Sequence, residues 1–302
     1  MEIKNISVIG AGTMGNGIAH VFAQYGFKTT LCDISQEQLE KALANIQKNL
    51  DRQLQKGILT EIQKAACLSN LCTNTNLQEA VAQADLVVEA ATENEPIKLK
   101  IFAEMDLHSP EHTILASNTS SISITRIAAA TKRPDKVIGM HFMNPVPVMK
   151  LVEIIKGYST STETLKQIES CTSKLQKVPI LVNDYPGFIA NRILMPMINE
   201  AIYSLYESVA GVNEIDQVMK LGMAHPMGPL QLADFIGLDV CLAILKELHQ
   251  GFGNPKYSPC PLLINMVAAK QLGVKSGRGF YDYTSGQKEA QVSSHFIKYS
   301  VS

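Results

Sequence analysis

A histidine and a glutamate are placed to form an acid–base pair. His141 ends an apolar run that starts at Val137, and Glu153 lies inside a second apolar run that ends at Ile155. If the two runs form an antiparallel pair around a turn centred on Pro147, His141 faces Glu153. A carboxylate fixes the tautomer of an imidazole, and a glutamate among apolar side chains is costly to bury alone. We therefore predict acid–base chemistry; the alternative is a structural histidine with a solvent-exposed glutamate on an edge strand.

A glycine-rich turn follows the first apolar run of the chain, where Val8 to Gly15 read V-I-G-A-G-T-M-G. Glycines at this spacing let the backbone turn tightly, approach a pyrophosphate and pack a helix on a strand. Asp33 ends the next β-type run about twenty positions later, where a Rossmann unit hydrogen-bonds the ribose of NAD. We expect a dinucleotide site rather than a plain structural turn. The residues of the turn expected to contact the cofactor are Gly10, Gly12, Thr13, Met14 and Gly15.

Polar clusters follow three further strand-like runs, at residues 89–94, 117–121 and 141–145. In open α/β sheets, ligands bind outside the carboxyl ends of the strands. Each cluster is therefore expected near the nicotinamide half of a bound dinucleotide. The candidate residues in and just after these clusters are Glu93, Lys98, Asn118, Ser120 and Asn144.

The composition is that of a folded globular protein without excess charge. The 302 residues are 46% hydrophobic and 18% charged, and the formal net charge of -1 gives no reason to expect a nucleic-acid partner. The six cysteines form no C-x-x-C pair and no Cys/His cluster at zinc spacing, so we expect thiols in a reducing compartment and no metal site. No apolar stretch reaches membrane-spanning length and no signal peptide precedes the first strand, so we expect a cytoplasmic protein without a membrane partner.

Strand-like and helix-like runs alternate through the first part of the chain, which predicts an α/β fold with a Rossmann-type, mostly parallel sheet. Capping signals at Ser35 and Thr60 predict a helical arm between the second and third strands, and this arm carries Lys48, Arg52 and Lys56. The predicted strands lie at residues 6–9, 29–32, 71–73, 86–89, 113–117, 137–142, 151–155 and 178–181.

The character of the sequence changes at Pro186 and Gly187, a pair typical of a domain boundary. We assign residues 1–185 to an NAD-binding domain, 186–290 to a helical C-terminal domain for substrate binding and dimerisation, and 291–302 to a flexible tail. Broad apolar helix faces in the second domain favour burial against a partner subunit. Only helices are expected there, at residues 189–210, 212–220, 229–251 and 261–270.

Seven segments between residues 4 and 283, in this order, resemble the L-3-hydroxyacyl-CoA dehydrogenase family, and within it the bacterial 3-hydroxybutyryl-CoA dehydrogenases. The longest reads H-F-M-N-P-V-P-V-M-K-L-V-E at residues 141–153. The others are residues 10–15, E-A-A-T-E-N at 89–94, A-S-N-T-S-S at 116–121, P-G-F-I-A-N-R at 186–192, P-M-G-P at 226–229 and K-S-G-R-G-F-Y at 275–281.

The resemblance implies a role for residues in both domains. His141 corresponds to the family's catalytic base and Glu153 to the carboxylate that orients it. Ser120 and Asn191 correspond to residues that hydrogen-bond the reacting oxygen and the thioester region. The cofactor contacts implied in the same way are Asp33, Glu93, Lys98, Asn144 and Lys275.

Some of these assignments have simpler structural alternatives. Ser120 would also serve as the N-cap of a helix over residues 122–130, and Asn191 would also bond a neighbouring turn. Lys56 corresponds to a lysine on the arm that reaches the coenzyme A nucleotide, although the serine often found near it is Asn49 here.

The activity implied by the resemblance is the reversible, NAD-dependent oxidation of an (S)-3-hydroxyacyl-CoA, with a short-chain substrate such as 3-hydroxybutanoyl-CoA giving acetoacetyl-CoA. The enzyme is expected to be a homodimer. Asp33 would repel a 2′-phosphate, which favours NAD over NADP. The alternatives are a β-hydroxyacid dehydrogenase that acts on a free acid, and a relative that binds NAD without turnover.

Overall fold

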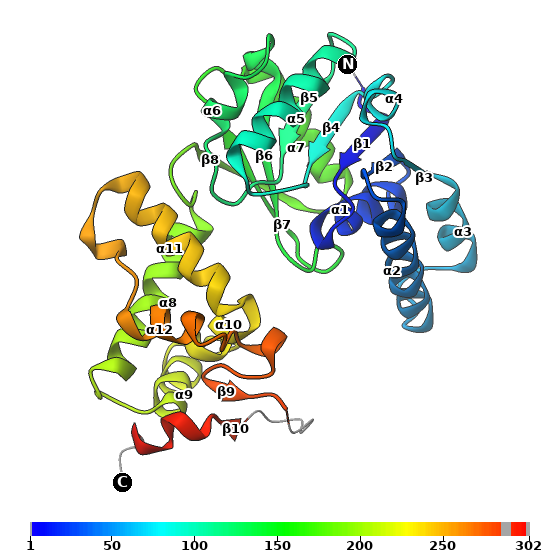
Figure 1. Ribbon diagram of the computed structural model, residues 1–302. Coiled ribbons are helices and arrows are strands. Elements are labelled where there is room, and N and C mark those ends of the chain that lie inside the picture. The colour runs from blue at the N-terminus through cyan, green and yellow to red at the C-terminus, as the bar shows by residue number, and fades with distance from the viewer. Residues whose placement is uncertain (1, 285–290, 300–302) are drawn as a thin grey trace. The chain divides into compact units, whose positions relative to one another are not determined.

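The computed structural model in Figure 1 describes residues 2–284 and 291–299. The chain divides into two units, Met1–Tyr185 and Pro186–Ser302, and the division falls at the Pro-Gly pair. Each unit has a hydrophobic core of its own. Among the described helices, none has the length and apolar character needed to cross a membrane.

The first unit is built on an eight-stranded sheet with the order β3-β2-β1-β4-β5-β6-β7-β8. Neighbouring strands pair in parallel, except β6 and β7, which are antiparallel. The expected Rossmann-type, mostly parallel sheet is thereby confirmed, and the carboxyl ends of β1, β4, β5 and β6 share one edge. The strands are β1 (Asn5–Ile9), β2 (Lys28–Cys32), β3 (Leu71–Asn74), β4 (Leu86–Glu89), β5 (Ile114–Ser117), β6 (Val137–Phe142), β7 (Leu151–Lys156) and β8 (Val178–Asn183).

The predicted helical arm is present as α2 (Gln36–Gln55) and α3 (Glu61–Ser69). Thr60 and Gln63 form a complete capping box at the start of α3. Apolar side chains of α2 and α3 pack against α1 in a small core of their own. The main core of the unit lies between the sheet and α1, α2 and α7. The other helices are α1 (Thr13–Gln24), α4 (Leu77–Val81), α5 (Glu95–His108), α6 (Ile124–Ala128) and α7 (Thr162–Lys174).

The second unit is mainly helical, and two of the predictions for it are wrong. The helix predicted over residues 229–251 is two helices, because Gly237 adopts a φ of 102° that ends one and starts the next. The unit also contains two short antiparallel strands, β9 (Tyr281–Asp282) and β10 (Gln291–Val292), where only helices were expected. Its helices are α8 (Ala190–Tyr206), α9 (Val212–Gly222), α10 (Pro229–Ile236), α11 (Leu238–Phe252) and α12 (Pro261–Ala268).

The expectation of a flexible tail from residue 291 is wrong for residues 291–299. After β10 the chain forms a 3-10 helix, Ser294–Tyr299, whose Phe296 is buried. The ring of Phe296 lies 5.6 Å from that of Phe280, which is also buried. This aromatic contact anchors the segment to the second core. Residues 285–290 of the predicted domain and 300–302 of the predicted tail lie outside the described residues.

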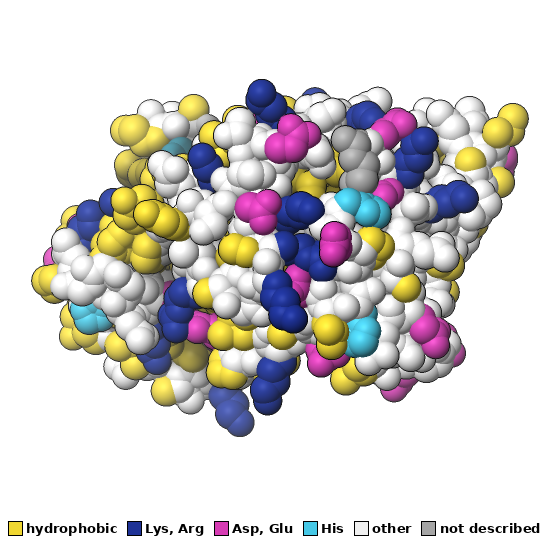
Figure 2. All heavy atoms as spheres, turned by 90° about the horizontal axis from the view of Figure 1, so that it is seen from above, with side chains coloured by type: hydrophobic (Ala, Val, Ile, Leu, Met, Phe, Trp, Pro, Cys, Tyr) yellow, Lys and Arg dark blue, Asp and Glu magenta, His cyan; other side chains and the backbone are white. Residues whose placement is uncertain are grey.

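The surface carries both signs of charge. Figure 2 shows lysine and arginine side chains interspersed with aspartate and glutamate on the face that it presents, in keeping with a formal net charge of -1.

Candidate active site

The glycine turn connects β1 to α1, and its backbone leaves no space for side chains at two of the three glycines. Gly10 has a φ of +101°, and a Cβ there would lie 2.6 Å from the Cα of Ala91. A Cβ on Gly15 would lie 1.7 Å from the carbonyl oxygen of Gly10. At Gly12, the N-cap of α1, an added Cβ would meet nothing within 4 Å, and no side chain caps the helix. The N-terminus of α1 is thus an open cradle of backbone N–H groups that fits a pyrophosphate.

Asp33, the residue after β2, lies beside the same group of backbone N–H donors. Its Oδ2 accepts a hydrogen bond of 2.8 Å from the N–H of Ala11, inside the glycine turn. Its Oδ1 accepts one of 2.9 Å from the N–H of Ser35. The carboxylate is therefore fixed beside the turn, where it suits a ribose hydroxyl and opposes a phosphate.

His141 and Glu153 face each other as predicted. They are directly opposed in the antiparallel pair β6–β7, and His141 Nδ1 lies 2.8 Å from Glu153 Oε2. Glu153 is 2% exposed and His141 is 9% exposed. The alternative of a solvent-exposed glutamate on an edge strand is wrong, because β8 pairs with the outer side of β7. With Nδ1–H donating to the carboxylate, Nε2 becomes the nitrogen that exchanges a proton.

Ser120 and Asn118 lie just beyond β5, beside the end of β6. The N–H and the Oγ of Ser120 both bond Glu93 Oε1, at 2.6 and 2.8 Å. Asn118 Oδ1 accepts a 2.9 Å hydrogen bond from the N–H of Phe142, the residue after His141. Ser120 is not a helix cap, since Ser123 is the N-cap of α6. The loop after β5 is therefore tied both to Glu93 and to the strand that carries His141.

Lys98, a predicted cofactor contact, is 1% exposed and forms an ion pair that sequence reasoning missed. Its Nζ lies 2.5 Å from Glu89 Oε2 and 3.9 Å from Glu93 Oε2. Glu89 ends β4 and is fully buried. A glutamate at a strand end, nine residues before a lysine in the next helix, was the only signal in the sequence.

The other predicted site residues lie farther along the chain or on the arm. Asn144 is exposed in the turn after β6. Lys56 is the exposed C-cap residue of α2. Asn191 is the second residue of α8 and is 9% exposed. Lys275, in a 3-10 helix, forms an ion pair with Asp239. Asn191 and Lys275 belong to the second unit, whereas His141, Glu153, Ser120, Glu93, Asn118 and Lys98 gather at the carboxyl edge of the sheet in the first.

The cysteines and acidic side chains form no metal centre within residues 2–284 and 291–299. All six cysteines are free thiols, and burial raises the pKa of Cys67 to about 11 and that of Cys171 to about 12. These thiols are protonated at neutral pH and are poor nucleophiles.

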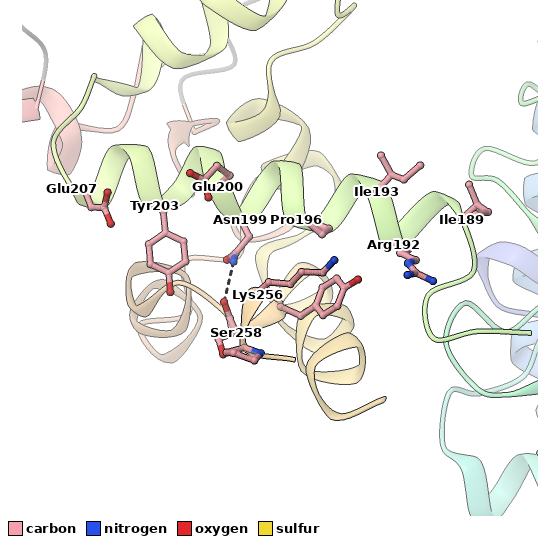
Figure 3. Close-up of a pocket in the computed structure, with 12 residues that line it drawn as sticks. Ile189, Arg192, Ile193, Pro196, Asn199, Glu200, Tyr203, Glu207, Lys256 and Ser258 are labelled. Atoms are coloured by element: carbon pink, nitrogen blue, oxygen red, sulfur yellow. Dashed lines mark hydrogen bonds between the residues drawn. The ribbon is translucent and has the colours of Figure 1, made fainter. Parts of the chain in front are cut away.

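A groove of about 860 Å³ runs beside α8 in the second unit (Figure 3). Asn199 forms part of its wall and donates a 2.9 Å hydrogen bond to the carbonyl of Ser258. Arg192 lies 4.6 Å from the ring centre of Phe252. None of the predicted site residues lines this groove.

Two family models together match most of the chain. The 3-hydroxyacyl-CoA dehydrogenase NAD binding domain matches residues 5–185, and the C-terminal domain of the same family matches residues 187–283. A probable 3-hydroxybutyryl-CoA dehydrogenase of Bacillus subtilis is 55% identical over 283 residues, which are 94% of this chain and 98% of the relative. The 3-hydroxybutyryl-CoA dehydrogenase of Bradyrhizobium diazoefficiens is 53% identical over 93% of this chain and 96% of its own length.

The fold matches that of a solved relative. The crystal structure of (S)-3-hydroxybutyryl-CoA dehydrogenase PaaH1 from Ralstonia eutropha aligns with a TM-score of 0.91 and 49% identity, and the match covers 94% of this chain and 100% of that one. The chain belongs to the 3-hydroxyacyl-CoA dehydrogenase family.

Proposed function

We propose that this protein catalyses the reversible, NAD-dependent oxidation of an (S)-3-hydroxyacyl-CoA to the 3-oxoacyl-CoA, with 3-hydroxybutanoyl-CoA as substrate. The observation that carries the proposal is the buried pair of His141 and Glu153, 2.8 Å apart, at the edge of the sheet that also holds the glycine turn. The names of the relatives from Bacillus subtilis, Bradyrhizobium diazoefficiens and Ralstonia eutropha support the choice of a C4 acyl group.

In the oxidative direction, His141 Nε2 removes the proton of the 3-hydroxyl group. Bound NAD supplies the acceptor for the hydride that leaves C3. Glu153 stabilises the imidazolium as it forms, because its carboxylate already lies on Nδ1. Ser120 and Asn191 hold the substrate oxygen while it becomes a carbonyl. In the reductive direction, His141 returns the proton.

The cofactor site that we propose uses the residues of the first unit described above. Gly10, Gly12, Thr13, Met14 and Gly15 hold the pyrophosphate at the start of α1, and Asp33 binds the ribose and favours NAD over NADP. Residues proposed to border the nicotinamide half are Glu93, Asn118, Asn144 and Lys275, together with Lys98, which approaches Glu93.

Oxidation of NADH in the presence of acetoacetyl-CoA tests this function, with free acetoacetate and longer 3-oxoacyl-CoA thioesters as comparisons. We expect turnover with acetoacetyl-CoA and none with the free acid. Turnover of the free acid alone would identify a β-hydroxyacid dehydrogenase, and NADH binding without any turnover would identify a non-catalytic relative.

Substitution of the base gives a second test. His141→Gln is expected to retain NADH binding and to lower kcat by ~10²–10⁴-fold, the range for a missing general base. Near-normal turnover in this variant would refute the assignment of His141.

Lys56→Ala is the matching test for the coenzyme A nucleotide, and it should raise the KM for acetoacetyl-CoA while leaving kcat unchanged.

We further propose that the protein is a cytoplasmic homodimer assembled through the second unit. Apolar side chains lie exposed on and just after α9, where Val218 is 62%, Leu221 82% and Met223 60% exposed. Covering such side chains is the usual driving force for subunit association. Analytical ultracentrifugation should give twice the mass of one chain, and a Leu221→Glu variant should sediment as a monomer.

The six cysteines of the protein are free thiols, which fits the reducing cytoplasm, and cell fractionation would test this location.

A further inference from the structure

We propose that Glu89 is a positioning residue of the active site, which keeps the Lys98 ammonium away from Glu93 and so leaves Glu93 to hold Ser120. This inference deepens the proposed function and rests on it, because Ser120 is assigned to the reacting oxygen.

The first step of the argument is the number of segments that meet on one buried carboxylate. Glu89 Oε1 accepts a 2.9 Å hydrogen bond from the N–H of Ala91, in its own loop. Glu89 Oε2 accepts hydrogen bonds from Lys98 Nζ of α5 at 2.5 Å and from Ser117 Oγ of β5 at 2.9 Å. The carboxylate therefore joins the end of β4, the end of β5 and the first turns of α5. A fully buried charge keeps its place only with such partners.

The second step is the competition between two carboxylates for one ammonium group. Lys98 Nζ lies 2.5 Å from Glu89 but 3.9 Å from Glu93 Oε2, beyond hydrogen-bond distance. Glu93 instead accepts from Thr119 Oγ1 at 2.8 Å and from both the N–H and the Oγ of Ser120. Glu93 can hold Ser120 in this way because Lys98 is already neutralised.

The third step follows from removing that neutralisation. In a Glu89→Gln variant the amide oxygen still accepts hydrogen bonds, yet Lys98 has no buried counter-charge. Its nearest carboxylate is then Glu93, and an ion pair between them would draw Glu93 off Ser120. The hydroxyl of Ser120 would lose its hydrogen bond to Glu93 Oε1, and a misplaced oxygen-binding group slows the chemical step more than it weakens cofactor binding.

The experiment measures kcat with acetoacetyl-CoA and saturating NADH, and the dissociation constant of NADH by fluorescence. We expect Glu89→Gln to lower kcat about tenfold while NADH binds within about fivefold of its wild-type affinity. In a Ser120→Ala background, Glu89→Gln should have almost no further effect, because the two residues act in one chain of contacts.

The matched control is Asp106→Asn, which neutralises a buried carboxylate at the other end of α5. Asp106 is 8% exposed and pairs with Arg133 at 2.6 Å. We expect it to lower the free energy of unfolding with kcat unchanged. If Asp106→Asn lowers kcat as much as Glu89→Gln, the effect is one of helix stability and the proposal fails.

The double variant Glu89→Gln with Lys98→Met removes both buried charges. It keeps the proposal testable if Glu89→Gln alone does not fold. Because no ammonium remains to draw Glu93 away, Ser120→Ala should lower kcat in this background by the same factor as in wild type, within about threefold. If Ser120→Ala has almost no effect in the double variant, or if the losses from Glu89→Gln and Ser120→Ala are additive, the proposal is overturned. Wild-type turnover is measured first, so an inactive wild type refutes the proposed function, whereas a fully active Glu89→Gln variant refutes only the role of Glu89.

Discussion

Replacing Glu153 by glutamine removes the charge that stabilises the imidazolium of His141 and leaves the side-chain shape unchanged. At the 2.8 Å separation of Nδ1 and Oε2, the charge pair is worth about 6 kcal/mol at an effective dielectric constant of about 20. The glutamine oxygen still accepts a hydrogen bond from Nδ1–H, so about half of this is retained, by the usual ratio of neutral to charge-assisted hydrogen bonds. The remaining loss of about 3 kcal/mol predicts that kcat for oxidation of 3-hydroxybutanoyl-CoA falls by about 10²-fold.

The assay is the formation of NADH at saturating substrate, with the affinity for NADH and the urea midpoint as controls for folding. The same substitution in a His141→Gln background should change kcat by less than about threefold, because Glu153 then has no imidazolium to stabilise. A loss smaller than threefold in the wild-type background, or equal losses in the two backgrounds, would refute the pairing.

Three further predictions concern the cofactor cradle and stability. Gly15→Ala should raise the dissociation constant of NADH by at least ~10²-fold in a fluorescence titration, since its Cβ would overlap the Gly10 carbonyl, and unchanged affinity would contradict this. Burial lowers the pKa of His20 to about 4, so the unfolded chain binds the proton first as the pH falls. The free energy of unfolding should therefore decrease by about 3 kcal/mol between pH 6.5 and pH 4. His20→Gln should flatten that part of a profile of urea midpoint against pH, and an unchanged slope would exclude His20 as the cause. Burial raises the pKa of Asp234 to about 6, so stability falls by about 3 kcal/mol as pH rises from 3.8 to 6. Asp234→Asn should remove that loss, and a profile that keeps it would exclude Asp234 as its source.

The sheet and the acid–base pair could be predicted because their signals are local. Every strand of the first unit lies within two residues of its predicted bounds. The facing of His141 and Glu153 followed from symmetry about Pro147, since alternation along two paired strands leaves little freedom of register. The glycine turn is equally local, because the crowding at Gly10 and Gly15 arises within one strand–turn–helix unit and its neighbouring strand.

The features that could not be predicted from the sequence depend on contacts between distant segments. The helix break at Gly237 is hidden inside an unbroken apolar pattern, and only the backbone conformation shows it. Lys98 was expected to contact the cofactor, but its ion pair with Glu89 is visible only once the fold buries both side chains. Phe296 packs on Phe280, which lies in an earlier segment, and residues 291–299 alone give no sign of that contact.

The antiparallel pairing of β6 and β7 makes the length of the intervening loop a requirement of the acid–base pair. Side chains alternate between the two sides of a strand, so inserting or deleting a single residue between His141 and Glu153 would turn the acid away from the base. Residues 143–150 must therefore supply a fixed number of positions between the two strands, as well as the side chains that the site uses.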